Sequence, residues 1–179
     1  MDLDDKELVA QAKAGDRKAF DKLVKRYKDK MFALTYRMTG DREAALDLVQ
    51  DTFFSAYREL RGFREDANLS SWLYRIASNK SLNFLRRRKL VSFLPLGESP
   101  SSEPAYEMED QVTYNELSKE MAAGIENLPG KQKLVFNLRF FEKMSFPEIA
   151  AVLNKSESTV KTNYQKAVEK LQKRLKAFR

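Results

Sequence analysis

The spacing of apolar residues is the feature that most limits how this chain can fold. Between residues 6 and 62 apolar side chains recur mostly three or four positions apart, and the same spacing resumes from 114 to 179. A period of three to four residues places such side chains on one face of an α-helix. No stretch combines alternating apolar residues with the turn signals of a β-hairpin. The sequence therefore predicts an all-α fold.

Glycine and aspartate pairs divide the first half of the chain into helices. Gly15-Asp16 and Gly40-Asp41 each combine a glycine that can end one helix with an aspartate that can cap the next. Three helices are expected before residue 62. A fourth is expected from about Ser70 to Lys89, with Ser70 or Ser71 as its N-cap.

The composition changes abruptly in the middle of the chain. Residues 92–113 contain three prolines and five acidic residues but no basic residue. Such a segment cannot bury enough apolar surface to fold and is typical of a tether. We therefore expect two small helical domains, residues 1–91 and 114–179, joined by a flexible acidic linker at 92–113.

Charge balance and two missing residue types narrow the possible functions. The 179 residues include 33 Lys and Arg against 26 Asp and Glu, which gives a formal charge of +7. A basic chain favours polyanionic partners, with nucleic acid first among them. The absence of Cys and His removes thiolate and imidazole ligands and most of the common catalytic groups. We expect a protein that is not an enzyme and that uses no cofactor or metal.

The N-terminus and the length of the apolar runs indicate in which compartment the protein works. Residues 1–7 are acidic and lack the apolar run of a signal peptide. The apolar runs elsewhere are short and interrupted by charge, well below the roughly 18 residues of a membrane span. We expect a soluble, cytoplasmic protein with no membrane insertion of its own.

A helix-turn-helix is predicted near the C-terminus. Ser145-Phe146-Pro147-Glu148 fits a capping box, with Pro147 in the tolerant first turn. Asn154 can adopt the left-handed conformation that ends this helix, and Ser156 can cap the next. From Ser156 onward there are seven cations against two acids, a density suited to binding phosphates. Two surface helices with a solvated basic face are the plainer alternative, but the charge density favours DNA binding.

Several short blocks along the chain share the pattern of one protein family. The blocks are residues 47–54, 63–67, 71–79, 86–88, 128–129 and 148–150. In their order and spacing they are similar to the extracytoplasmic-function (ECF) group of bacterial RNA polymerase sigma factors, over nearly the whole chain. The resemblance implies a subunit that brings core polymerase to promoters, recognises the −10 and −35 elements and melts the DNA.

In the first domain, the resemblance implies contacts with core polymerase through residues 47–57. Exposed acids mixed with aromatic residues suit a basic, partly apolar helical surface such as the clamp helices of the β′ subunit. The expected contacts are Asp47, Gln50, Asp51 and Phe54. The remaining apolar residues of this stretch, Leu48, Val49, Phe53 and Tyr57, are expected in the core.

The same resemblance implies that this domain binds the −10 element. Melting a promoter requires a pocket for an unstacked base, with apolar walls and a polar reader. Phe63 and Asn79 match the family positions of that pocket, residues 64–71 match its specificity loop, and Trp72 is expected to be a core anchor. The full expected −10 set is Phe63, Arg64, Asn68, Ser71, Trp72, Arg75, Asn79, Lys80, Arg86, Arg87 and Arg88.

In the second domain, the resemblance implies that the helix-turn-helix reads the −35 element. The expected residues are Ser158, Thr159, Lys161, Thr162, Gln165 and Lys166. Lys161 and Lys166 depart from the common pattern, because family members often carry Arg, which pairs more rigidly with guanine. The resemblance also implies contacts with the β flap of polymerase and an anti-sigma factor that covers these surfaces.

Two other functions remain open at this point. A stand-alone, dimeric helix-turn-helix regulator would bind an operator with the same C-terminal segment, although this alternative accounts only for the last third of the chain. A nuclease or nucleotidyl transferase would need clustered acids for divalent metal ions. Asp47 and Asp51 lie one helical turn apart, but no further acid completes such a site at a convincing spacing.

Overall fold

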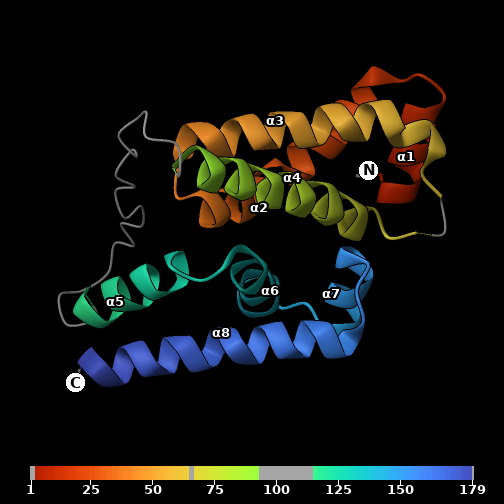
Figure 1. The fold of residues 1–179 in the computed structure, drawn as a ribbon. Coiled ribbons are helices and arrows are strands. Elements are labelled where there is room, and N and C mark those ends of the chain that lie inside the picture. The colour runs from red at the N-terminus through yellow and green to blue at the C-terminus, as the bar shows by residue number, and fades with distance from the viewer. Residues whose placement is uncertain (1–2, 65–66, 93–114, 179) are drawn as a thin grey trace.

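A computed structural model describes residues 3–64, 67–92 and 115–178 of the chain, and these residues form helices and connecting turns without a strand (Figure 1). The all-α prediction is confirmed. The predicted linker at 92–113 lies outside the described residues, apart from Ser92 at the end of a helix. The elements are α1 (Asp5–Lys13), α2 (Arg17–Thr39), α3 (Arg42–Glu59), the 3-10 turn η1 (Leu60–Gly62), α4 (Leu69–Ser92), α5 (Asn115–Glu126), α6 (Gly130–Phe140), α7 (Phe146–Leu153) and α8 (Glu157–Phe178).

The two glycine-aspartate pairs separate α1, α2 and α3 as predicted. The Asp16 carboxylate accepts hydrogen bonds from the first turn of α2, and the Asp41 carboxylate accepts one from the first turn of α3. Gly40 ends α2 in the left-handed conformation, at φ 67°. These local signals therefore set the helix boundaries.

The expected N-cap of α4 was wrong. Ser70 and Ser71 lie inside the helix, and the cap is Asn68, whose side-chain oxygen accepts the backbone N–H of Ser71 at 2.9 Å. Asn68 and the two serines are all good N-cap residues, so propensity alone could not choose among them. The helix begins where Leu69, which is 6% exposed, can enter the core.

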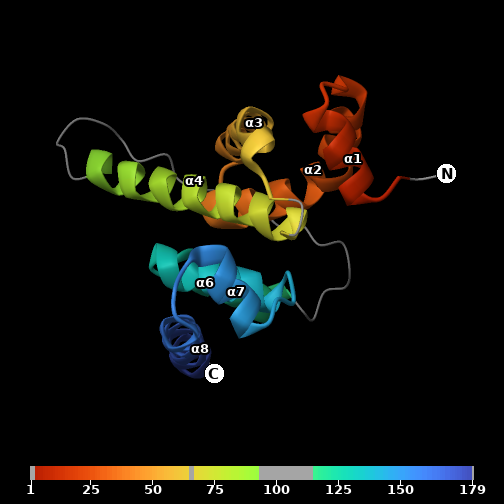
Figure 2. The same cartoon turned by 90° about the vertical axis from the view of Figure 1, so that its right-hand side faces the viewer.

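Helices α1 to α4 form one bundle. Helices α3 and α4 both pack against α2 and against each other, and Figures 1 and 2 show α1 at one end of the bundle. Buried apolar side chains from all four helices fill the space between them, among them Leu8, Leu34, Phe53 and Leu73. Burying each such side chain stabilises the fold by about 1.5–3 kcal/mol relative to leaving it in water.

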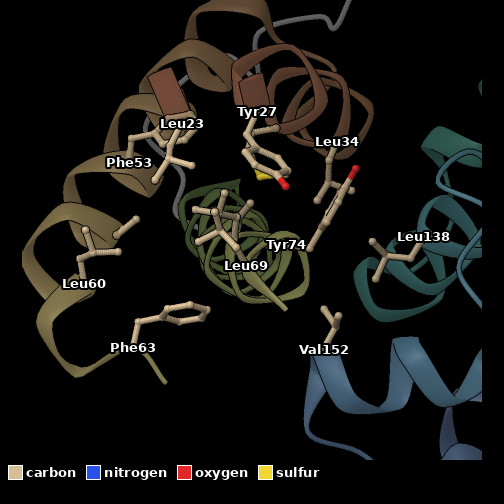
Figure 3. Packing of buried hydrophobic residues seen from close by; sticks show 14 of the residues in the cluster. Leu23, Tyr27, Leu34, Phe53, Leu60, Phe63, Leu69, Tyr74, Leu138 and Val152 are labelled. Atoms are coloured by element: carbon tan, nitrogen blue, oxygen red, sulfur yellow. The ribbon is translucent and has the colours of Figure 1, made fainter. Parts of the chain in front are cut away.

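Helices α5 to α8 form a second group, in which α6 lies between α8 and the first bundle (Figure 1). One face of α6 contacts α8, and another contacts α2 and α4. Leu138 and Val152 therefore join the same buried cluster as Tyr74 and Leu34 of the first bundle (Figure 3). The two groups pack directly against each other.

Polar contacts reinforce the boundary between the two groups. The Glu142 carboxylate, after α6, accepts hydrogen bonds from the guanidinium of Arg37 on α2 and the hydroxyl of Tyr74 on α4. The side chains of Arg37 and Glu142 are only 12% and 14% exposed. Lys133 of α6 donates to the Met38 carbonyl at 3.0 Å, at the end of α2. We call the contacts among Arg37, Tyr74 and Glu142 the Glu142 clamp.

Two buried tyrosines make the stability of the fold depend on pH in the alkaline range. Burial, with hydrogen bonds to Asp5 and Glu142, raises the pKa of the Tyr27 and Tyr74 hydroxyls above their ordinary value near 10. Because the unfolded chain loses these protons first, their contribution to the free energy of unfolding is intact below about pH 10 and falls above it.

Lys133 has the opposite effect, because burial lowers the pKa of its ammonium group. Its contribution to the free energy of unfolding therefore rises with pH up to about 10.4. Urea unfolding of the wild type and of Tyr74→Phe, at about pH 8 and pH 11, isolates the contribution of the Tyr74 hydroxyl, because Tyr27 and Lys133 are present in both proteins. We expect the variant to lose less stability than the wild type between these pH values. Equal losses would contradict a role for the Tyr74 hydroxyl.

Candidate nucleic-acid interface

The predicted helix-turn-helix is present as α7 and α8. Ser145 and Glu148 form the capping box, and the hydrogen bonds from Ser145 lower the pKa of the Glu148 carboxyl. Asn154 ends α7 in the left-handed conformation at φ 51°. The Ser156 hydroxyl accepts the backbone N–H of Thr159 at 3.2 Å and so caps α8. A three-residue turn thus sets the angle between the two helices.

The left-handed turn residue provides a test of this geometry. Asn154→Val should destabilise the C-terminal helices by about 1–2 kcal/mol, because a β-branched side chain is strained at positive φ. Asn154→Gly is the matched control and should lose much less. Thermal unfolding measured by circular dichroism would show the difference, and equal midpoints for the two variants would contradict a left-handed residue at this turn.

The outer face of α8 carries all six residues expected to read the −35 element. Ser158, Thr159, Lys161, Thr162, Gln165 and Lys166 are exposed. Lys161 pairs with Glu157 at 2.6 Å, and the Gln165 amide donates to Glu169 at 3.1 Å. These are surface contacts of the kind that contribute little and exchange readily for phosphates or base edges.

Aromatic residues hold α8 against α6 and α7. Tyr164 lies edge-on to Phe146 of α7, with ring centroids 5.5 Å apart, and parallel to Phe136 of α6 at 6.1 Å. Val160 and Ala167 on the same side of α8 are buried. These contacts fix the inner face of α8, so its polar face points toward solvent.

A second exposed polar face runs along α4. Arg75, Asn79, Asn83 and Arg86 are exposed and lie three or four residues apart, so they share one side of the helix. We call these four residues the α4 stripe. The Asn83 carboxamide accepts a hydrogen bond from Arg86 at 2.5 Å. Two amides flanked by two guanidinium groups suit a path along nucleic acid, where cations hold phosphates and amides meet bases.

Other residues of the expected −10 set have different surroundings. Lys80 is half-buried, with its amine 3.9 Å from Asp51 of α3. Arg88 donates to the Thr39 carbonyl at 3.0 Å and so caps the end of α2. Arg87 is exposed. The expected basic cluster is therefore split between residues that face solvent and residues that contact a neighbouring helix.

The corner between α3 and α4 brings Phe63 and Trp72 together. Phe63 is 7% exposed, and its ring lies 4.7 Å from the ring of Trp72. The half-buried Trp72 packs against the core, as expected. Both rings line a hollow of about 410 Å³ together with Arg58, Glu59 and Gly62. Arg64 and Asn68 are exposed beside this corner, whereas Ser71 is half-buried.

The outer face of α3 presents the four expected polymerase contacts. Asp47, Gln50, Asp51 and Phe54 are exposed, and the aromatic side chain of Phe54 is 67% exposed. Leu48 and Phe53 are buried and Val49 is half-buried, as expected.

Tyr57 was wrongly expected in the core. It is 47% exposed, with its ring edge-on to Phe20 at 4.9 Å. Its position three residues after Phe54 adds a second aromatic side chain to the exposed face of α3.

No group of acids in the described ranges could hold a metal ion. Across the same ranges, no helix is both long and apolar enough to cross a membrane.

Comparison with known proteins identifies both helical groups. Residues 23–91 match Sigma-70 region 2, and residues 118–171 match Sigma-70, region 4. The ECF RNA polymerase sigma factor SigW of Bacillus subtilis is 34% identical, over 98% of this chain and 99% of the relative. This chain belongs to the ECF RNA polymerase sigma factors.

Other relatives agree with this assignment. The RNA polymerase sigma-H factor of Pseudomonas aeruginosa is 32% identical, over 96% of this chain and 93% of the relative. CnrH, solved in complex with the cytosolic domain of CnrY, shares 30% identity and a TM-score of 0.70, over 97% of each chain. The sequence-based resemblance is confirmed.

The two matched ranges take in most of the helices of this sigma factor. Region 2 includes α3, most of α2 and all of α4 except its last residue, and region 4 includes α6, α7 and most of α5 and α8. Helix α1 lies outside both matched ranges. Sequence reasoning missed Asn83, although its spacing from Asn79 and Arg86 would have placed it on the same side of α4.

Proposed function

We propose that this sigma factor brings core RNA polymerase to specific promoters by reading the −10 element with α4 and the α3–α4 corner, and the −35 element with α8. One observation carries the proposal. A single chain presents two separate exposed faces of amides and cations, one in each region matched to the family, and the face on α8 adds hydroxyls. When two weakly binding faces of one chain contact the same DNA molecule, the overall affinity is raised although neither contact is strong by itself.

The two faces suit different forms of DNA. Helix α8 projects from a helix-turn-helix, so the side chains near its N-terminus can reach base edges in a duplex major groove. The α4 stripe lies beside a corner lined by aromatic rings, which suits unstacked bases in a melted strand. Duplex binding at −35 and strand capture at −10 together account for recognition followed by melting.

Core polymerase would dock on α3. Phe54 and Tyr57 supply exposed aromatic surface, and Asp47, Gln50 and Asp51 surround it with acidic and amide groups. An aromatic centre with a polar rim is the usual composition of a protein interface, and the acids complement a basic helical surface such as the β′ clamp helices. Region 4 would contact the β flap.

The division of the chain, its compartment and its regulation follow from this function. Residues 1–91 and 114–179 act as the two DNA-binding domains, and residues 92–113 connect them. The sigma factor works in the cytoplasm, where polymerase is, and acts by binding rather than by catalysis. An anti-sigma factor that covers α3, α4 or α8 would keep it inactive.

Run-off transcription with purified core polymerase tests this function. We expect discrete start sites on genomic fragments only when the sigma factor is added. Asn79→Ala and Lys161→Ala should each reduce their yield by about 5- to 150-fold, the cost of losing one base contact. Lys25→Ala, an exposed lysine on α2, is the control. Wild-type protein that produces no start sites would refute the proposal, and unimpaired variants would refute the residue assignments.

A further inference from the structure

Helix α1 is held against the rest of the first bundle by polar contacts at both of its ends. Near its start, the Asp5 carboxylate accepts hydrogen bonds from the guanidinium of Arg26, at 2.6 Å, and from the hydroxyl of Tyr27. At its last residue, the Lys13 ammonium donates to the backbone carbonyl of Phe63 at 2.5 Å. Leu8, between these ends, is fully buried. The helix is thus held at a set position against the α3–α4 corner.

Three contacts hold Phe63 in place, and one of them comes from Lys13. The backbone N–H of Phe63 donates to the Leu60 carbonyl at 3.0 Å, which closes the turn η1. Its ring packs on Trp72. Its carbonyl is held by Lys13, from a helix fifty positions earlier in the sequence. The contact with Lys13 acts on the carbonyl and therefore sets how the backbone leaves this residue.

The same residue lines two hollows at the corner. One is the hollow of about 410 Å³ that Phe63 lines with Trp72. The other is a hollow of about 180 Å³, lined by Asp5 and Val9 of α1, by Phe63, and by Asn68 and Leu69 at the start of α4. A shift of the Phe63 backbone would therefore change the shape of both. Asn68 fixes the far side of the corner as the cap of α4.

We propose that α1 braces the α3–α4 corner and that Lys13 is a positioning residue for base selection at the −10 element. The inference rests on the proposed function, because it takes the corner as the place where −10 bases are received. Lys13 acts through the Phe63 carbonyl, and it touches no DNA in this role. Selectivity depends on this contact because a binding pocket must hold its walls within a fraction of an ångström to distinguish bases.

A direct contact between Lys13 and a phosphate is the competing explanation, and the two differ in what they predict. Loss of a phosphate contact weakens binding to all sequences alike and lowers the slope of log affinity against log salt by about 1. Loss of a brace changes the preference among bases and leaves the slope unchanged. Substitution of Asp5 adds a second distinction. If electrostatics alone were at work, removing its negative charge would only strengthen DNA binding.

The test compares holoenzymes made with wild type, Lys13→Met, Lys13→Arg and Asp5→Asn on promoters that carry each of the four bases at each −10 position. We expect Lys13→Met and Asp5→Asn to reduce the ratio of preferred to disfavoured bases by at least about 5-fold at one or two positions, with an unchanged salt slope. Lys13→Arg, which can still donate to the carbonyl, should restore the ratio. Lys18→Met, which removes the same charge from an exposed site on α2, is the control and should match the wild type.

Three results would overturn the inference: wild-type base preference in Lys13→Met, a uniform loss across promoters with a lower salt slope, or failure of Lys13→Arg to restore the ratio. Thermal unfolding of each variant separates a local effect from loss of the fold, and Asp5→Asn provides a second route to the same readout. If the proposed function itself is wrong, the wild type will produce no promoter-specific transcripts, so that failure is distinguishable.

Discussion

Glu142→Ala is expected to separate the two helical groups. The substitution removes the acceptor for both Arg37 and Tyr74 and leaves the Arg37 guanidinium buried without its counter-ion. The Nε atom of Arg37 already has no hydrogen-bond partner among the described residues. Breaking a buried ion pair from one side costs about 3–5 kcal/mol, and the chain can avoid most of this cost by exposing Arg37 to water. The groups should therefore move apart.

Small-angle X-ray scattering measures this change as a larger radius of gyration, and circular dichroism should show that helix content is retained. Glu157→Ala is the control, because its pair with Lys161 is exposed and worth only about 0.5 kcal/mol or less. An unchanged radius and unchanged stability in Glu142→Ala would contradict the Glu142 clamp. Exchanging the charges, Arg37→Glu with Glu142→Arg, should restore part of the compact form that Glu142→Arg alone loses.

Phe54→Ala is expected to weaken binding to core polymerase by roughly 30- to 1000-fold. An aromatic side chain at the centre of an interface typically contributes about 2–4 kcal/mol when truncated. Phe54 is 67% exposed, so its removal should leave the fold of α3 intact. Competition with a labelled sigma factor for core polymerase measures the loss.

Leu90→Ala is the matched control for this prediction. Leu90 is as exposed as Phe54, at 68%, but it lies near the end of α4, a different helix from the one proposed to carry the polymerase contacts. Its variant should bind core polymerase like the wild type. Equal losses for the two variants, or none for Phe54→Ala, would contradict the assignment of the α3 face.

The helices and the helix-turn-helix were predictable because their signals are local. Asp16, Asp41, Ser145 and Asn154 each act on a backbone group within four residues, so sequence position alone reveals them. The cap of α4 failed as a prediction because three nearby residues could all serve, and the choice depended on which apolar residue entered the core.

Contacts between distant segments could not be predicted. Lys133 and Asn137 are buried polar residues on α6, and nothing in their local pattern distinguishes them from solvated ones. The Glu142 clamp joins residues 37, 74 and 142, which are brought together only by packing of the two helical groups. Tyr57 was misplaced for the same reason, since its apolar spacing fits a core position.

The candidate sites also differ in how far local sequence patterns could predict them. The polar face of α8 followed from helix periodicity, and all six of its expected residues are exposed. On α4 the family pattern supplied the expected residues: Arg75 and Asn79 are exposed, whereas Lys80 and Arg88 contact Asp51 and the end of α2. Whether a cation is engaged by a neighbouring helix depends on tertiary structure.

Permanganate footprinting of one promoter with core polymerase alone, the sigma factor alone and both together would show whether this chain melts DNA as a polymerase subunit. Permanganate modifies unpaired thymines, so it reports melting at the −10 element. We expect reactive thymines only when both proteins are present, and their loss with Asn79→Ala. Tight binding of the sigma factor alone to duplex DNA, with no melting when core polymerase is added, would contradict the proposed function and favour an operator-binding regulator.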